Sequence, residues 1–314
     1  MSAADIQAKA FTNETAAREA MEALLWPNGP VCPHCGSAEK IGRVEGKSAR
    51  PGLCYCGACK EQFTVTVGTI FERSKVPLSK WWMAIHLMAS SKKGVSAHQL
   101  HRMLGIAYQT AWFMEHRIRE AMRDGALSPM GGEGSTVEID ETFVGRKNGF
   151  ETKRGFGHKN AVLTLVERGG SARSFHIESV NRDDVLPIVR ENLARESHVV
   201  TDEAARYAKL GDEFAKHDAV DHSRGEYGYT DRATGAKINT NTIEGYYSIF
   251  KRGMRGVYQH CGEKHLHRYL AEFDFRYSNR TKLGVNDAMR AAKIVEGAKG
   301  KRLQYRGPDE SALT

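Results

Sequence analysis

Hydrophobic residues recur with helical spacing between residues 76 and 123. Leu100 and Leu104 lie on one face of a helix that Gly105 should end. The helix that follows has a second apolar stripe, made of Ala111, Met114, Ile118 and Met122. Two helices joined by a glycine turn form the helix-turn-helix pattern, although an ordinary helical hairpin has the same signature.

The same pattern predicts where these helices begin and what they present. The first helix of the region should be capped by Ser79 and end at Gly94. The helix after Gly105 would offer polar side chains to a ligand, namely Tyr108, Gln109, His116, Arg117 and Arg119. Contact with DNA is the role that this arrangement favours.

Beyond a Gly/Ser/Pro-rich boundary at residues 125–136, alternation replaces the helical spacing. Residues 136–145 predict a strand with Val137, Ile139 and Phe143 on one side and Glu138, Asp140 and Thr142 on the other. Residues 160–179 predict two further strands joined at Gly169 and Gly170. A helix over residues 181–196, capped by Asn181, and a strand over 197–204 complete the series.

A three-stranded meander, a crossover helix and another strand resemble the RNase H-like order. In that order the first strand and the strand after the helix lie side by side and parallel. Asp140, in the first strand, and Asp202, at the end of the later one, would then meet at one edge of the sheet. The expected fold class is therefore α/β.

Two helices are predicted in the last third of the chain. The stretch "NTIEGYYSIFKRGM" buries a stripe made of Ile243, Tyr247, Phe250 and Met254. That stripe leaves Asn241, Glu244, Ser248 and Lys251 on a separate face. Residues 262–280 predict a late helix with Leu266, Tyr269, Leu270, Phe273 and Tyr277 turned inward.

Composition adds a partner class to this outline. The 314 residues are 40% hydrophobic and 27% charged, which are values of globular proteins with a sizeable core. The formal net charge of +8 favours a polyanionic partner, nucleic acid first. The N-terminus has no apolar signal core, and "WWMAIHLMA" is too short to span a bilayer, so we expect no membrane partner and a soluble, intracellular protein.

Four of the six cysteines have the spacing of a zinc site. Cys32 and Cys35 form one C-x2-C pair, and Cys56 and Cys59 form a second. Two tight turns that each offer two thiolates suit tetrahedral Zn²⁺, so residues 28–70 predict a zinc ribbon. Cys54 and Cys261 are expected to take no part in it. After Cys59, Phe63, Val65 and Val67 predict one face of a strand.

The two aspartates suggest a second kind of metal site. Mg²⁺ prefers oxygen ligands and uses only one or two carboxylates, leaving room for water and phosphate. Two such ions can clamp both oxygens of a phosphoryl transfer. Taken alone, Asp140 is equally compatible with a solvent-facing strand position and Asp202 with a helix cap. Their acidic neighbours, Glu138, Glu141 and Glu203, are expected on the solvent side or behind the ligands.

Together these stretches resemble the DDE-type transposases of bacterial insertion sequences, in particular the ISXO-like transposases with an N-terminal zinc ribbon. The resemblance rests on "CPHCGS", "FTVTVGTIFE", "VEIDETFVGRK", "VVTDEA", "NTIEGYYSIFKRGMRGVYQH" and "KHLHRYLAEFDFRYSNR", spread over about residues 30 to 280. It implies an RNase H-like domain, DNA strand cleavage and transfer, and a requirement for two Mg²⁺ or Mn²⁺ ions. By position, Asp140 and Asp202 are the first two acids.

The third ligand falls within "NTIEG", where the resemblance allows glutamate or asparagine. Glu244 is one choice, with Lys251 two helical turns further on to meet a phosphate. Asn241 is the other choice for the third ligand, and Glu244 would then only support it. In a third interpretation Asn241 caps the helix and Glu244 completes a capping box. We favour Glu244, because a carboxylate binds a hard cation better than an amide does.

Basic residues near these acids point to a DNA substrate. The resemblance implies that this is double-stranded DNA, both element ends and target, bound by a homo-oligomer in the bacterial cytoplasm. The predicted DNA-binding residues are Arg146, Lys147, Lys153, Arg154, Lys251, Arg252 and Arg255. For each of these residues, the alternative to DNA binding is a place on an ordinary solvated, charged surface. Two other functions stay open: a zinc-ribbon DNA-binding regulator with an inactive domain, and a structure-selective nuclease.

The predicted organisation has five parts. They are an N-terminal helix (1–27), the zinc ribbon (28–70), a helical DNA-binding region (76–124), the RNase H-like catalytic domain (134–285) and a C-terminal tail (286–314).

Overall fold

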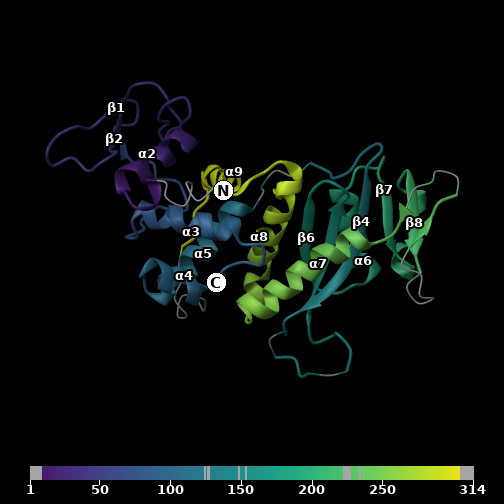
Figure 1. Cartoon of the computed structure of the whole chain (residues 1–314). Helices are drawn as coiled ribbons and strands as arrows, with labels where there is room; N and C mark the ends of the chain where they lie inside the picture. Colours follow the sequence, from purple (N-terminus) through teal and green to yellow (C-terminus); the bar gives the residue numbers. More distant parts are fainter. Residues whose placement is uncertain are drawn as a thin grey trace. The chain divides into compact units, whose positions relative to one another are not determined.

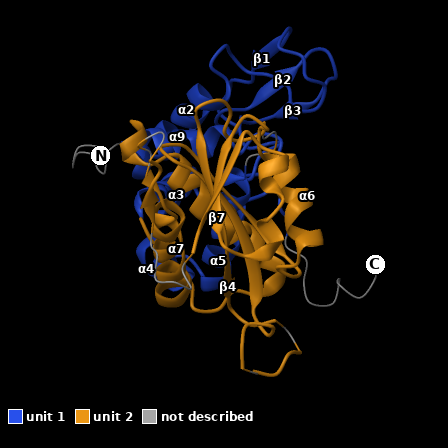
Figure 2. Ribbon diagram, turned by 90° about the vertical axis from the view of Figure 1, so that its right-hand side faces the viewer, with its two compact units in different colours: residues 1–91, 95–123, 285–314 blue, residues 92–94, 124–284 orange. Residues whose placement is uncertain are grey.

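The computed structural model describes residues 9–123, 125, 128–147, 149–152, 154–221, 228–232, 235 and 237–304. The chain divides into two compact units (Figures 1 and 2). Unit 1 comprises residues 1–91, 95–123 and 285–314, and unit 2 comprises residues 92–94 and 124–284. Lys153, one of the predicted DNA-binding residues, lies outside the described residues.

The described part of unit 1 starts with a 3₁₀ turn, η1 (Lys9–Phe11), and helix α2 (Glu14–Leu25), followed by the cysteine-bearing region. Strands β1 (Ile41–Arg43), β2 (Cys54–Cys56) and β3 (Gln62–Phe63) form a small antiparallel sheet in that order. Phe63 is fully buried beside the cysteines. The zinc-ribbon outline expected from the spacing is therefore present.

The strand predicted to continue through Val67 is wrong beyond Phe63. Residues 64 to 69 turn, and the backbone N–H of Val67 donates to the carbonyl of Thr64 at 3.1 Å. The hydroxyls of Thr64 and Thr66 also lie 2.9 Å apart. Alternating β-branched residues favour a strand, but these local hydrogen bonds offer the backbone a turn instead.

Three helices follow in unit 1: α3 (Leu78–Ser90), α4 (Ala97–Leu104) and α5 (Tyr108–Met122). The hydroxyl of Ser96 caps α4 by accepting from the N–H of Gln99, and Gly105 ends the helix in the left-handed conformation, φ 59°. The predicted helix, glycine turn and helix are thus confirmed. Ser79 is not a cap, because α3 already starts after Pro77 and the Ser79 hydroxyl donates to Glu14. The helix also ends at Ser90 rather than at Gly94.

Most of the polar side chains predicted to face a ligand from α5 are buried. His116 and Arg119 have no exposed surface, and Arg117 is only 9% exposed. Arg119 pairs with Glu115 at 3.1 Å, and Arg117 donates to the carbonyl of Leu303. Only the first turn of α5, with Tyr108 and Gln109, presents the exposed face that the prediction requires.

The predicted C-terminal tail is wrong for its first part, which forms helix α9 (Asp287–Glu296) in unit 1. The side chain of Asn286 caps it by accepting from the N–H of Met289 at 2.9 Å. Arg290 is buried and donates to the carbonyl of Ala89 at 2.6 Å. The apolar spacing that marks this helix is short, because only Ala291, Ile294 and Val295 carry it.

Unit 2 is built on a five-stranded mixed sheet. Its strands are β4 (Thr136–Val144), β5 (Asn160–Glu167), β6 (Ala172–Ile177), β7 (His198–Asp202) and β8 (Lys216–Val220). The spatial order is β6-β5-β4-β7-β8, with β4, β5 and β6 antiparallel and β7 and β8 parallel to β4. This is the predicted meander and parallel pair, and it confirms the α/β, RNase H-like class.

Helices cover both faces of that sheet (Figures 1 and 2). Helix α6 (Arg182–Asn192) packs on the face with Val137 and Ile139. Helices α7 (Asn241–Gly253) and α8 (Leu266–Ser278) pack on the face with Val162 and Val166. The predicted inward residues of α7 and α8 all belong to this second core, Tyr277 being partly buried.

Several short elements complete unit 2 and the chain end. They are the 3₁₀ turns η2 (Ala205–Tyr207), η3 (Leu210–Asp212), η6 (Glu263–His265) and η7 (Thr281–Leu283), the hairpin β9 (Tyr229–Thr230) and β10 (Lys237–Ile238), and a π-helical turn η5 (Met254–Tyr258). None of the helices within the described ranges combines the length and the apolar character that a membrane span requires.

Candidate active site and metal centre

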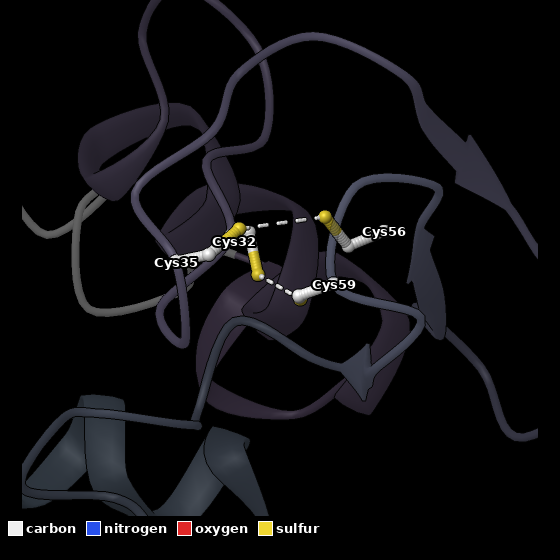
Figure 3. A group of neighbouring side chains, drawn as sticks. All are labelled: Cys32, Cys35, Cys56 and Cys59. Atoms are coloured by element: carbon white, nitrogen blue, oxygen red, sulfur yellow. Dashed lines mark hydrogen bonds between the residues drawn. The ribbon is translucent and has the colours of Figure 1, made fainter.

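Four cysteine thiols converge in the zinc-ribbon region (Figure 3). The Sγ atoms of Cys32 and Cys59 are 3.6 Å apart, and those of Cys35 and Cys56 are 3.7 Å apart. A tetrahedron with Zn–S bonds of about 2.3 Å has edges of about 3.8 Å. The sulfur positions therefore fit one Zn²⁺, and Cys54 and Cys261 stand outside the group.

The acidic residues gather at the edge where β7 ends beside β4. Val137 pairs with Val199 and Glu138 with Val200, so the parallel register points Asp140 toward Asp202. Carboxylate oxygens of Asp140, Glu141 and Asp202 lie within 4.8 Å of one another. The prediction that the two aspartates meet is confirmed, and Glu141 joins them.

The surroundings of Asp140 disfavour its charged form. Burial raises the pKa of the Asp140 carboxyl to about 7, and the negative charges of Glu141 and Asp202 act in the same direction. The Lys251 ammonium on α7 opposes them. A group of carboxylates that repel one another in a partly buried place is the donor set that a hard divalent cation stabilises. The residues present thus fit a Mg²⁺ or Mn²⁺ site.

Glu141 differs from the two aspartates because a cation and a hydroxyl already bind it. Arg206 donates to both of its oxygens, at 2.8 and 2.6 Å, and the Tyr207 hydroxyl donates to Oε1. Arg206 also lies 3.7 Å from Asp202. Of the two positions expected for these neighbours, Glu141 takes the one behind the aspartates, since its side chain is only 3% exposed, whereas Glu203 lies on the solvent side.

Glu138 is a second acid that lies behind the aspartates and not on the solvent side. It is fully buried, and Arg168 contacts its Oε1 at 2.7 Å. Its other oxygen accepts the backbone N–H of Ile243 at 2.9 Å. The guanidinium of Arg168 also donates to the carbonyls of Lys237 and Asn239. Glu138 and Arg168 therefore fix the start of α7 to β4, two residues from Asp140.

The start of α7 excludes one of the three interpretations of "NTIEG". Asn241 is the first helical residue rather than the cap, which is Thr240. The side chain of Asn239 accepts from the N–H of Asn241 at 3.2 Å, and Glu138 satisfies the N–H of Ile243. A capping box between Asn241 and Glu244 is therefore wrong, since the N–H groups are satisfied from elsewhere.

Helix α7 also approaches the acids directly. The Tyr247 hydroxyl donates to the backbone oxygen of Asp140 at 2.6 Å. The Lys251 ammonium lies 5.6 Å from the centre of the Tyr247 ring. Glu244 accepts from the Thr240 hydroxyl at 3.1 Å and is not among the described acids that converge within 4.8 Å. Both Glu244 and Asn241 are exposed.

The described basic residues of the prediction lie on two segments of unit 2. Arg146, Lys147 and Arg154 belong to the loop between β4 and β5, and Lys251, Arg252 and Arg255 to the second half of α7 and the π-helical turn. Arg146, Arg154, Arg252 and Arg255 are exposed. Arg252 hydrogen-bonds the carbonyl of Ser248 one turn earlier.

Comparison with known proteins defines the class to which this fold and site belong. Residues 131–278 match a family model described as an ISXO2-like transposase domain, and residues 12–62 match one described as a transposase zinc-ribbon domain. Together the matched segments span more than half of the chain. The chain belongs to the family of ISXO2-like DDE transposases with an N-terminal zinc ribbon.

A particular relative and a solved structure are also similar. The chain is 28% identical over 290 residues to an uncharacterized protein in transposable element ISH50 of Halobacterium salinarum, covering 85% of this chain and 92% of the relative. A chain in the structure of a simian T-cell lymphotropic virus intasome with the PP2A regulatory subunit B56 gamma matches at a TM-score of 0.28 and 15% identity. That match covers 56% of this chain and 63% of the other.

Proposed function

We propose that this transposase binds the ends of its element and catalyses metal-dependent cleavage and joining of DNA strands. The observation that carries the proposal is the convergence of Asp140, Glu141 and Asp202 at one edge of the sheet, in a chain of this family. Zn²⁺ at the four cysteines has a structural role in the proposal, and Mg²⁺ or Mn²⁺ at the acids has the catalytic one.

Asp140 and Asp202 are the residues that would hold two divalent cations, with Glu244 as the third ligand. When bound, such cations activate the attacking oxygen and neutralise charge on the phosphate. The role of Lys251 is to contact a phosphate beside Asp140, whose pKa its charge already influences. Asn241 remains the alternative third ligand, because it precedes Glu244 by one turn on an exposed part of α7.

We assign Glu141 a positioning role instead of a ligand role. Its two oxygens accept three hydrogen bonds from Arg206 and Tyr207. This pairing orients the short segment after β7 and places a guanidinium near Asp202. A carboxylate already neutralised in this way gains less from a cation than Asp140 does.

DNA would be held by the described basic residues of unit 2 and by parts of unit 1. The zinc ribbon and the first turn of α5 are our proposed readers of the element ends, and a homo-oligomer assembled on DNA is the proposed form. Phosphate contacts of this type weaken as the salt concentration rises. Such a substrate would place the protein with the chromosomal DNA of a bacterial cytoplasm.

The test uses purified full-length protein and a DNA fragment that carries the element ends, identified as terminal inverted repeats around the gene. Cleavage and joining in Mg²⁺ should fall at least ~100-fold in Asp140→Asn and Asp202→Asn, in line with the loss of a transition-state charge partner. Glu196→Gln, an exposed acid outside the cluster, is the matched control. Undiminished activity in Asp140→Asn would refute the proposal.

The same assay distinguishes the other candidates. End binding with no metal-dependent cleavage indicates a DNA-binding regulator, and cleavage without joining indicates a structure-selective nuclease. For the third ligand, Glu244→Gln should abolish cleavage in a folded protein and Asn241→Ala should not. The reverse result would assign the ligand to Asn241.

A further inference from the structure

The loop between β4 and β5, residues 145–159, exposes two large aromatic rings. Phe150 is 52% exposed and Phe156 is 56% exposed. The segment contains five basic residues and one acidic residue, Glu151. Two exposed aromatic rings on one short segment rich in basic residues are a combination that suits contact with nucleic acid. Figure 1 shows this loop extending from the end of the sheet.

The described parts of the loop contain two turns of similar construction. In the first, the N–H of Phe150 donates to the carbonyl of Lys147, and the Lys147 ammonium lies 5.8 Å from the centre of the ring. In the second, the N–H of Lys159 donates to the carbonyl of Phe156, and the Lys159 ammonium lies 5.2 Å from that ring. Each turn thus joins one exposed ring to one cation.

A glycine with positive φ precedes each ring. Gly149 has φ 77° and Gly155 has φ 92°, values that side chains with a Cβ rarely adopt. No atom lies within 4 Å of a Cβ built at either glycine. The backbone conformation, not crowding, therefore calls for glycine, and it sets the direction in which each phenylalanine leaves the loop.

Contacts at the base of the loop fix its two ends and the Phe156 ring. The N–H of Lys147 donates to the carbonyl of His158 at 2.9 Å, which closes the loop. The Lys147 ammonium donates to the carbonyl of Glu178 at 3.0 Å. Phe156 stacks on Phe143 of β4, with ring centres 4.7 Å apart and planes 8° apart. Ordering this ring in advance lowers the entropy cost of stacking on a ligand.

The loop begins close to the acidic cluster. Phe143 follows Asp140 by three residues on the same strand, which corresponds to about 10 Å. Successive nucleotides of one DNA strand rise by about 3.4 Å, so the backbone at which the loop begins lies roughly three nucleotides from a phosphate held at Asp140.

We propose that this loop is a binding site for unpaired nucleotides of DNA next to the cleavage position. Phe150 and Phe156 stack on bases, and Lys147 and Lys159 neutralise the adjoining phosphates. Bases inside a duplex have both faces covered by neighbours, so a ring gains a stacking partner only from a base that has left the duplex. The inference rests on the proposed function, because it assumes a DNA substrate at Asp140.

The experiment measures binding of the full chain to two probes by fluorescence anisotropy, in Ca²⁺ to prevent cleavage. One probe is a blunt duplex, and the other has the same sequence with three unpaired nucleotides at one end, including 2-aminopurine. The protein should prefer the unpaired end by about tenfold and change the 2-aminopurine fluorescence, as stacking requires. Phe150→Ala with Phe156→Ala should lose this preference and keep duplex affinity within about threefold.

Three further variants make the result specific. Phe150→Tyr with Phe156→Tyr should keep the preference, since a phenol stacks as a phenyl ring does. Lys147→Ala should weaken binding to both probes and reduce the salt dependence. Tyr229→Ala removes an exposed ring elsewhere in unit 2 and should change nothing.

Failure of the inference and failure of the proposed function give different results. A protein that binds neither probe contradicts both. A protein that binds duplex DNA without preference for the unpaired end contradicts only the inference, as does a preference that survives the double alanine change. Loss of self-association in the alanine variant, with the preference intact, would assign the rings to a contact between copies.

Discussion

Glu138 shows how one buried carboxylate connects two parts of the candidate site. It has no exposed surface, and its two oxygens bind Arg168 and the N–H of Ile243. A buried charge is tolerated only when such partners replace its lost hydration. Because Asp140 lies two residues further along β4, the same contacts set the distance between Asp140 and the residues of α7.

Replacing Glu138 by Gln should therefore affect both stability and activity. The amide cannot accept at both positions, and it leaves Arg168 without its ion-pair partner. Loss of one partner from a buried ion pair costs about 3–5 kcal/mol, and we expect the free energy of unfolding in urea to fall by roughly that amount. Glu196→Gln, at an exposed position, should change it by less than about 0.5 kcal/mol.

The activity of the Glu138→Gln protein separates positioning from stability. At a temperature where the variant stays folded, the cleavage rate should still fall, whereas binding of duplex DNA should not. Normal cleavage by the folded variant would limit Glu138 to a structural role.

Asp274 on α8 is a second carboxylate with hydrogen-bond partners inside the protein, although it is only partly buried, and its charge should make stability depend on pH. It accepts from the N–H and hydroxyl of Ser174 and from the Tyr246 hydroxyl. Burial nevertheless raises the pKa of Asp274 to about 6 from an ordinary 3.8. The folded state thus holds the proton more tightly, so this stabilisation is complete below about pH 4 and is lost as the pH rises through 6.

Asp274→Asn should remove this dependence. Between pH 4 and pH 7, the unfolding free energy of the natural protein should fall relative to that of the variant by ~3 kcal/mol at most, from a pKa difference of about two units. Urea unfolding at several pH values gives both curves. Parallel curves would show that the Asp274 carboxyl is already charged in the folded protein at pH 4.

At the level of single residues, the sequence predicted the meeting of Asp140 and Asp202 better than their surroundings. Alternation placed Glu138 and Asp140 on one face of β4, and the structure agrees. It could not show that α7 covers that face, because this depends on a contact between residues about a hundred positions apart. For Glu138 the choice between the solvent side and a position behind the ligands therefore stayed open.

Among the elements, helix α7 contains two glycines with opposite steric surroundings. A Cβ at Gly253 would lie 2.5 Å from the Phe273 ring and 2.6 Å from the carbonyl oxygen of Lys93. A Cβ at Gly245 would meet nothing within 4 Å. The two positions therefore form a matched pair on one helix, since the same substitution has the same intrinsic effect on helix formation at both.

Gly245→Ala should stabilise the protein and Gly253→Ala should destabilise it. Alanine in an exposed helix interior gains up to about 1 kcal/mol over glycine. At Gly253 the added methyl would displace Phe273 or the backbone of Lys93, at a cost of about 1–3 kcal/mol. Thermal unfolding measures both signs. Equal shifts for the two variants would mean that the segment at Lys93 does not pack against α7 in solution.

The elements that the sequence missed are those with few buried apolar residues. Strand β8 buries only its last residue, Val220, and its polar residues are placed by pairing with β7. The turn after Phe63 replaced a predicted strand because threonine hydroxyls bond locally. Strong stripes, as in α5 and α7, were predicted correctly because burial of one face dominates their stability.

On the scale of the whole molecule, the chain order and the spatial order differ. Helix α9 follows unit 2 in the sequence and belongs to unit 1, where it packs with α2, α3 and α5. A tail was expected because a helix near the chain end gives no signal of which distant surface it covers. Unit 1 thus has two sources of stability, the helical core closed by α9 and the cysteine cluster.

The fold of the zinc ribbon should depend on a metal ion at the cysteine cluster. The ribbon has only three short strands and therefore little apolar core of its own. The purified chain should contain one zinc per molecule by metal analysis. Cys35→Ser and Cys59→Ser should lose it, and proteolysis should then become rapid within residues 28–70. Cys261→Ser should retain both zinc and resistance, since this thiol lies outside the cluster. Cys35→Ser leaves three thiolates, so one of the four tetrahedral positions has lost its sulfur. Full zinc content in that variant would therefore contradict a site that requires all four thiolates.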